Sequence, residues 1–437
     1  MNNNPSLTLG EKLMHVRKAR GYSQENVAHA LGKNRFFYQR IENEQTECDA
    51  ETLAAIRKFL DIENAPLLGH ELKFFKSQLW MIHDLLNADR YPEAEALFQK
   101  LSPILDLPFE SDLQLLYTMF EIRMLLIEAG NKQMEEKRNI AEEKLKSVES
   151  LIDFNTASDE VLQLFHCIKG SLCARKRDYM GRIKHFLKAI DHTTDNMPID
   201  ARLYFYIGSS YISLGKPFKA MVYLEYSKML DRNNTSRYAN HTNINIALAC
   251  MCTGAYKKAE KLLTESLIYA ESINSEQSKK TILLYLGSLY NTTKQYEKSI
   301  SFFDQAIAYA NNDRRAVVSI LCLKANSLCK LKKINEFHAV LAQARKSANG
   351  DEHYAIMIET ESHCMTLDNS DSLHYLENIA IPYMMKSKGV SALNAIGICK
   401  DIEAHYLKKR SKMKALTMAA TMRDIYEEAF FWDDDLE

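Results

Sequence analysis

Apolar residues recur every three to four positions along most of the chain, which is the spacing of one face of an α-helix. Near the start, for example, Leu9, Leu13 and Val16 are spaced for a common core. Glycine and proline, which interrupt helices, number only 14 and 8 in 437 residues, against an average usage of about 7% and about 5%. The pattern predicts an all-α protein.

The apolar pattern itself repeats in the long C-terminal part. Five segments align on a small residue, a bulky residue three positions later, then Gly or Lys, an aromatic residue, Ala and a late Phe or Leu. These segments are residues 163–191, 201–231, 240–270, 280–310 and 318–347. An earlier segment fits around Tyr91, Ala94 and Phe98. Residues 111–150, 352–385 and 390–430 have the length of a helix pair.

The small residues of the aligned segments allow one helix to approach the next closely. They are Gly170, Gly208, Ala247, Gly287 and Ala325. A single helix pair cannot bury its apolar stripe, so stacked pairs should form a superhelix with a concave inner wall. The segments resemble the tetratricopeptide repeat. That resemblance implies a right-handed superhelix of about nine degenerate repeats, and we assign residues 69–437 to it.

The first 60 residues have a different pattern. Gly21 interrupts the first helix, Ser23 is a favourable N-cap for the second, and Gly32 ends it. A third helix is expected from about residue 34 to 43, and a fourth over ETLAAIRKFLDI. Two short helices joined by a tight turn within such a bundle predict a helix-turn-helix.

The segment SQENVAHALGKNRFFYQRIENE resembles the lambda-repressor and Cro-like helix-turn-helix family. The SQ-x-x-VA start, the LG turn and the ending R-I-E-N carry the resemblance, which covers about residues 7–62. It implies a DNA-binding domain, placed here at residues 1–68. Glu44 stands where the family usually has glycine and Cys48 where it usually has proline. Both departures concern the loop after the recognition helix.

The same resemblance implies that the N-terminal half of the third helix enters the major groove. Arg35, Phe36 and Gln39 would meet base edges, because Arg pairs with guanine, Gln pairs with adenine and Phe packs on a thymine methyl. Contacts to phosphates, which fix the register, are expected from Gln24, Asn34, Arg40 and Asn43. The alternative for Phe36, and more so for Phe37, is packing within the bundle.

Charge limits the possible partners. Lys and Arg number 56 and Asp and Glu 57, so nucleic-acid binding has to come from a local patch. Residues 1–60 hold nine Lys and Arg against seven Asp and Glu. This small excess predicts modest affinity for one half-site and a homodimer or higher homo-oligomer. Without an 18-residue apolar run or a signal-peptide profile, the expected location is the cytoplasm, with no membrane contact.

Nine cysteines occur without a CxxC pair, mostly among apolar residues. This favours buried reduced thiols over metal ligands or disulfides. The sequence contains no Gly-rich phosphate loop, no HExxH and no GxSxG, and its histidines lack metal-ligand spacing. We therefore predict that the protein is not an enzyme and uses no metal or cofactor.

A Cro-like head followed by degenerate tetratricopeptide repeats resembles the peptide-pheromone regulators of Gram-positive bacteria, the RRNPP group, and most of all its NprR- and PlcR-type members. The resemblance implies a cytoplasmic quorum-sensing transcriptional regulator. In that group a short imported signalling peptide binds the concave groove of the repeats, changes the geometry of the homo-oligomer and so alters binding to operator DNA.

The repeat register places a set of polar side chains on the inner wall. They include Ser171, Arg175, Ser209, Ser288, Asn291, Asn326 and Lys330, with Arg202 and His241 near helix starts. The resemblance adds Asn240, Asn243 and Asn245, because the group uses Asn to bind peptide backbone, which an amide can do through both its donor and its acceptor. Arg123 joins them because a buried Arg requires an anion, either a ligand carboxylate or an internal Glu.

Two other functions stay open at this point. One is a repeat-mediated interaction regulator that binds a response-regulator protein, as Rap-type members do, with or without DNA binding. The other is a DNA-binding repressor whose repeats only dimerise and take no ligand. The polar residues at positions 24, 35, 39 and 40 favour a working DNA-binding head, and the polar inner wall favours a ligand.

Overall fold

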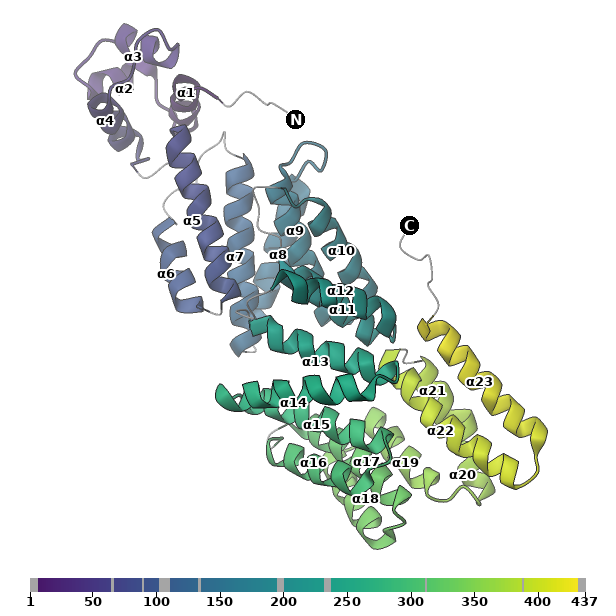
Figure 1. Ribbon diagram of the computed structural model, residues 1–437. Coiled ribbons are helices and arrows are strands. Elements are labelled where there is room, and N and C mark those ends of the chain that lie inside the picture. Colours follow the sequence, from purple (N-terminus) through teal and green to yellow (C-terminus); the bar gives the residue numbers. More distant parts are fainter. Residues whose placement is uncertain are drawn as a thin grey trace. The chain divides into compact units, whose positions relative to one another are not determined.

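The computed structural model describes residues 7–63, 67–88, 90–101, 111–132, 135–194, 200–231, 237–310, 313–386 and 389–430. All regular secondary structure in these ranges is helical (Figure 1), which confirms the predicted all-α class. None of the described helices combines the length and the apolar composition that a membrane crossing requires.

Four short helices form the head: α1 (Leu9–Ala19), α2 (Gln24–Ala30), α3 (Arg35–Glu42) and α4 (Ala50–Leu60). Each begins after a polar side chain that accepts a backbone N–H of the first turn, namely Thr8, Ser23, Asn34 and Asp49. Such caps satisfy amides that have no partner within the helix. Leu13, Val16, Val27, Tyr38 and Ile41 are buried in one core, as the spacing of Leu13 and Val16 predicted.

Both departures from the helix-turn-helix pattern lie in the loop after α3. Glu44 has φ of 56°, in the left-handed region that glycine adopts with least strain. Its carboxylate accepts a hydrogen bond from the Gly10 amide at 3.4 Å. Cys48 packs against the core of the head, and burial raises the pKa of its thiol to about 11. The loop therefore keeps the glycine-like conformation without the glycine.

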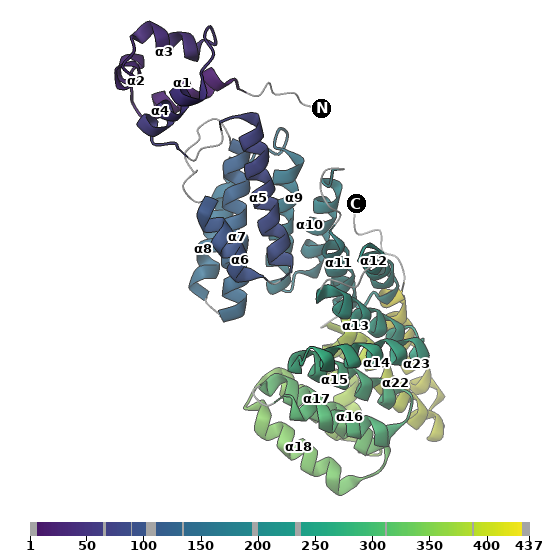
Figure 2. The same ribbon diagram turned by 60° about the vertical axis from the view of Figure 1, so that its left-hand side comes forward.

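Contacts divide the chain into two compact units, residues 1–169 with 188–198 and residues 170–187 with 199–437. Leu67 still packs into the core of the head. The first unit continues with α5 (Gly69–Asn87), α6 (Tyr91–Leu101), α7 (Ser111–Lys132) and α8 (Glu135–Leu151). The residues of α9 (Asp159–Arg175) and α10 (Tyr179–Asp191) are divided between the two units. Helices α5 to α8 run side by side in both ribbon views (Figures 1 and 2).

The second unit continues the helix pairs to the C-terminal region. They are α11 (Ala201–Ser213) with α12 (Pro217–Leu230), α13 (Arg237–Cys252) with α14 (Tyr256–Ser272), α15 (Glu276–Thr292) with α16 (Tyr296–Ala308), α17 (Arg314–Lys330) with α18 (Ile334–Ala348), α19 (Glu352–Cys364) with α20 (Ser370–Tyr375) and α21 (Ile381–Lys386), and α22 (Gly389–Lys408) with α23 (Lys412–Phe430). A π turn at Leu376–Ala380 joins α20 to α21. The repeat superhelix predicted from the sequence is present, and the described helices from α5 onward form nine such pairs.

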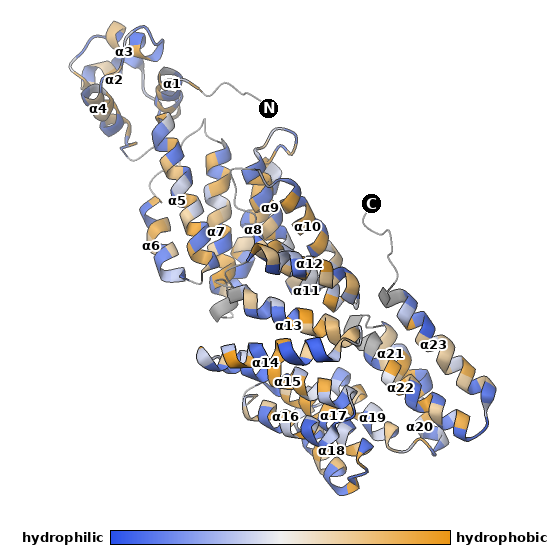
Figure 3. Cartoon of the chain, in the orientation of Figure 1, coloured by the Kyte–Doolittle hydropathy of each residue, from blue (hydrophilic) through white to orange (hydrophobic). Residues whose placement is uncertain are grey.

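The first helices of these pairs make up the inner layer of the second unit. Successive first helices touch, α11 with α13, α13 with α15, α15 with α17 and α17 with α19. The last pair also contacts the first pair of this unit, because α22 touches α11 and α23 touches α12. Along the helices apolar residues alternate with polar ones (Figure 3), as expected for helices that bury one stripe.

Small residues set the spacing within each pair. A Cβ atom built on Gly287 would lie 2.6 Å from two ring carbons of Phe303, which is itself fully buried. Gly208 meets Leu224 at the same distance. These glycines on α15 and α11 confirm that the aligned small positions are contact points between the paired helices.

The turn inside a pair also repeats. The second residue after the first helix has positive φ at Arg177, Gly215, Gly254, Lys294, Lys332 and Arg410. The turn requires a residue in the left-handed conformation, which glycine adopts most easily. A long side chain such as Lys is also accepted at this position, because it points away from the packed pair.

We expect Gly287→Ala to lower the stability of the chain by about 1–3 kcal/mol, the usual cost of overpacking a dense core. The matched control is Gly397→Ala on α22, where an added Cβ meets nothing within 4 Å and the helix should gain about 0.5–1 kcal/mol. Thermal unfolding of the full chain, followed by circular dichroism, measures both. Equal effects of the two substitutions would contradict the close-approach interpretation.

Candidate nucleic-acid interface and ligand groove

Helix α3 presents one face to solvent and one to the core of the head. Arg35, Phe36 and Arg40 are exposed and Gln39 is partly exposed, at the helical spacing of a single face. The Phe36 ring is 72% exposed, so it does not pack the bundle. Phe37 does pack against the core, with the Lys33 ammonium 5.5 Å from its ring centroid. The alternative of bundle packing thus applies to Phe37 and not to Phe36.

A buried ion pair fixes α3 against the two preceding helices. Arg17 on α1 donates to both carboxylate oxygens of Glu42, Nε to Oε1 at 2.6 Å and Nη2 to Oε2 at 3.0 Å. Gln24 on α2 donates from Nε2 to Glu42 Oε2 at 2.7 Å. The hydrogen bond from Arg17 to Glu42 raises the pKa of the guanidinium. Gln24, predicted as a phosphate contact, is thus also part of this internal network.

The remaining predicted phosphate contacts lie at the ends of α3. Asn34 is the N-cap, its side-chain oxygen accepting from Phe37 N, and Asn43 is the C-cap. Both are exposed. The structure therefore gathers the predicted DNA-contacting residues on α3 and at its two ends, with Gln24 on the adjoining helix.

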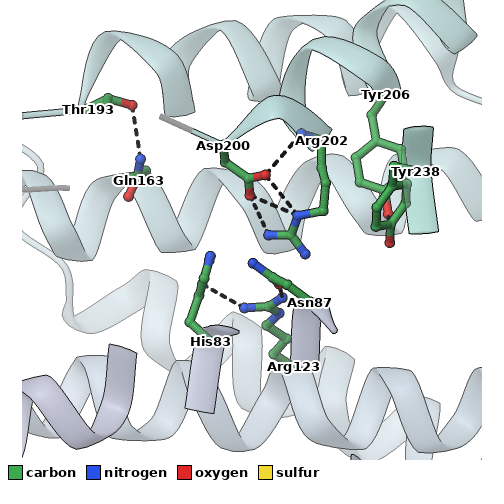
Figure 4. Close-up of polar contacts among 9 residues, drawn as sticks. All are labelled: His83, Asn87, Arg123, Gln163, Thr193, Asp200, Arg202, Tyr206 and Tyr238. Carbon is green, nitrogen blue, oxygen red and sulfur yellow. Dashed lines mark hydrogen bonds and ion pairs between the residues drawn. The ribbon is translucent and has the colours of Figure 1, made fainter. Parts of the chain in front are cut away.

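In the second unit, Arg202 lies in a cluster of aromatic and charged groups at the start of α11. Asp200, the N-cap residue, accepts from Arg202 Nε at 2.8 Å and also from Nη2. The guanidinium lies 5.9 Å from the Tyr238 ring centroid, and the Tyr206 and Tyr238 hydroxyls are 2.9 Å apart (Figure 4). Burial raises the pKa of Tyr206. Arg202 is thus held by an internal carboxylate.

Arg182 of α10 adds a second cation to this cluster. Its guanidinium lies 4.6 Å from the Tyr206 ring centroid and 5.5 Å from that of Phe186. Burial lowers its pKa. Its Nε atom is enclosed and has no hydrogen-bond partner among the described residues. Among the described residues, the contacts of this cluster thus bring together two arginines and one aspartate.

Asn243 on α13 has an enclosed side-chain oxygen that accepts no hydrogen bond within the described part of the chain. A buried acceptor without a donor costs about 1–3 kcal/mol. This atom is therefore suited to an N–H from a ligand, which is the chemistry that the sequence predicted for it.

Further along the inner layer, Asn291 donates to Asn326 at 3.1 Å between α15 and α17. Asn326 in turn donates to Glu361 Oε2 of α19 at 3.1 Å. Lys330 donates to Asp401 of α22 at 2.5 Å. Two predicted asparagines thus lie in one network, and Lys330 bridges two inner helices.

Other predicted ligand contacts are more dispersed. Ser209, His241, Asn245 and Ser288 are partly exposed on α11, α13 and α15, and Arg175 is exposed at the end of α9. Ser288 donates to the Leu284 carbonyl of its own helix at 3.0 Å. Arg123 belongs to the first unit, where its guanidinium contacts His83 Nδ1 at 2.7 Å and Asn87 Oδ1 (Figure 4).

Sequence reasoning missed the acidic and aromatic members of the inner wall. They are Asp200, Tyr206, Tyr238, Glu361 and Asp401. The sequence carried little signal for Glu361, because its helix EHYAIMIETESHC holds two other glutamates as well. Among the described residues no group of three or more His, Cys, Asp or Glu side chains is placed to hold a metal ion.

Comparison with known proteins agrees with both parts of this description. Residues 13–63 match the helix-turn-helix family, which is a binding module and not an enzyme class. A search of the curated proteins found no match.

Solved structures share the repeat architecture. The chain is similar to a Rap protein complexed with Competence and Sporulation Factor, with 15% identity, TM-score 0.64, and coverage of 82% of this chain and 98% of that one. It is similar to the apo quorum sensor NprR from B. thuringiensis, with 16% identity, TM-score 0.62, and coverage of 82% and 99%. The chain is also similar to NprR in complex with its cognate peptide NprX, with 16% identity, TM-score 0.59, and coverage of 80% of this chain and 99% of that one. At these identities the similarity concerns the fold.

Removing the acid of the buried pair should unfold the head. Glu42→Ala leaves the Arg17 guanidinium enclosed without its carboxylate, which costs about 3–5 kcal/mol. Hydrogen exchange of the α1 to α3 amides would report the loss of protection. Glu25→Ala, an exposed acid on α2, is the control and should leave protection unchanged. Unaltered exchange in Glu42→Ala would refute the role of the pair.

Proposed function

We propose that the chain is a cytoplasmic transcriptional regulator that binds operator DNA through α3 and is switched by a short signalling peptide on the inner face of its repeats. The observation that carries the proposal is the exposed face of α3. There, Arg35, Phe36 and Gln39 lie on a helix whose opposite face is locked into the head by Glu42 and Tyr38.

The chemistry of that face suits the major groove. A guanidinium and an amide supply the paired hydrogen bonds that distinguish guanine and adenine, and an exposed ring supplies an apolar contact for thymine. A ring that is 72% exposed in an otherwise well-packed head is hard to explain by stability alone. Because the head is only weakly basic, two heads on one operator are needed, and we propose a homodimer or higher homo-oligomer.

Peptide control is supported by the fold and by the inner wall. The apo and peptide-bound NprR structures share the architecture. The enclosed Asn243 oxygen and the amide network of Asn291 and Asn326 present the donors and acceptors that a peptide backbone requires. The Asn243 oxygen in particular would confer specificity, because it stays unpaired when the wrong ligand binds.

A second candidate function is docking of a partner protein, such as a response regulator, on the first unit. A groove of about 630 Å³ lies between α7 and α8, lined in part by Leu115, Ile140 and Val148. Leu151 at its rim is 72% exposed. Apolar surface of this kind marks interaction sites more often than it serves the monomer. Docking there is compatible with DNA binding by the head.

The double substitution Arg35→Ala with Gln39→Ala should abolish sequence-specific DNA binding and leave dimerisation intact. Operators selected from genomic fragments with the wild-type chain provide the ligand, and gel shift with analytical ultracentrifugation provides the two readouts. Lys58→Ala on α4 also removes an exposed positive charge and should reduce affinity only modestly. Unchanged operator affinity in the double variant would reject the α3 assignment.

A short peptide should raise the melting temperature of the chain, since a ligand that binds only the native form adds about 2.7 kcal/mol at one hundred times its Kd. Synthetic peptides from small reading frames beside the gene are the probes. Asn243→Leu should diminish the rise, whereas Gln305→Ala on the exposed face of α16 should not. No rise with any of these peptides would favour a ligand-independent repressor.

A further inference from the structure

Glu361 is an acid inside the inner layer of the second unit, on α19. One of its oxygens accepts from the Asn326 amide at 3.1 Å, the one hydrogen bond that its carboxylate makes among the described residues. Asn326 is itself held by Asn291. The side-chain amides of Asn291 on α15 and Asn326 on α17 thus form a hydrogen-bonded chain that ends at the Glu361 carboxylate. This carboxylate can accept several more hydrogen bonds.

The neighbouring cation is already engaged. Lys330, one turn after Asn326 on α17, donates to Asp401 of α22 at 2.5 Å. The carboxylates of Glu361 and Asp401 therefore lie near the same ammonium group, that of Lys330. This ammonium group donates its hydrogen bond to Asp401. Within the described part of the chain, three thiols also lie close enough to interact with Glu361, namely Cys322, Cys329 and Cys364. They carry no positive charge that could balance Glu361.

An enclosed carboxylate without a cation is unfavourable in its charged form. Burial accordingly raises the pKa of Glu361 to about 7, despite the opposing effects of Asn326 and Lys330. At neutral pH the group therefore exchanges readily between the acid and the anion. An incoming cation would stabilise the anion, since charge-assisted hydrogen bonds are the stronger kind. The residue as a whole is partly exposed on α19.

We propose that Glu361 receives a positively charged group of the bound peptide, either an Arg or Lys side chain or the free amino terminus. This inference rests on the peptide function proposed above and adds a requirement to it: the cognate peptide carries a cation at the position that faces α19. Asn326 orients the carboxylate, and the Lys330 ammonium group donates its hydrogen bond to Asp401.

The first test uses fragments and needs no knowledge of the peptide. N-acetyl-L-argininamide supplies a guanidinium and no other charge, and N-acetyl-L-citrullinamide is its neutral analogue of equal shape. Calorimetric titration of the full chain should show saturable binding of the first compound and none of the second. Affinity should rise about tenfold from pH 6 to pH 8, because at a pKa of about 7 the anionic fraction of Glu361 grows from about 10% to about 90%.

Glu361→Gln retains an oxygen for Asn326 and removes the charge, so the network and the fold should persist. It should weaken argininamide binding at least about tenfold and remove the dependence on pH. The matched control, Glu297→Gln, alters an exposed acid of α16 and should change neither. Saturable binding that persists in Glu361→Gln, or the absence of saturable binding to the wild-type chain, overturns the proposal.

A second arm separates this inference from the peptide function itself. Hexapeptide libraries with one position fixed as Arg, Lys or norleucine, each with a free or acetylated amino terminus, are captured on the wild-type chain and on Glu361→Gln. Enrichment of a cationic group on the wild-type chain alone supports the proposal and identifies the source of the charge. Peptide capture without that preference leaves the peptide function standing and removes the inference. Failure to capture any peptide counts against both.

Discussion

The close approach of paired helices is the constraint on which the repeat region depends. Where Gly287 meets the buried Phe303 ring, the backbone of one helix lies directly against a side chain of the next. This contact fixes the distance within a pair, and the left-handed residue of the following turn fixes the direction in which the chain returns. Successive first helices then fall into one inner layer, so that polar side chains from distant parts of the sequence share a wall.

The sequence was sufficient to predict features that depend on local spacing. The helix starts at Ser23 and Asn34, the core positions Leu13 and Val16, and the small contact positions in the repeats are each specified within a few residues. The α3 face could be predicted for the same reason, because one helix and its caps determine which side chains are exposed. Phe36 and Phe37 are adjacent, yet their opposite surroundings follow from the helical period alone.

The contacts that the sequence did not reveal join residues far apart in the chain. Lys330 meets Asp401 across 71 positions, and Gln24 meets Glu42 across the helix-turn-helix. Periodicity indicates that such residues face inward but not which partner each finds. Which residues meet depends on how many helix pairs lie between two helices and on how tightly the inner layer curves. Arg202 is a different case, because its carboxylate partner Asp200 is a near neighbour in the sequence, the N-cap residue of the same helix.

The contact of the last helix pair with α11 and α12 limits how the number of repeats in this chain could change. In an open array each repeat touches only its neighbours, and copies can be gained or lost with little effect on the rest. Here α22 also contacts α11, so this contact depends on the number of pairs that lie between the two helices. Duplication or deletion of one internal repeat would misalign that meeting point. A chain with one pair more or fewer would have to rebuild the contact between α22 and α11.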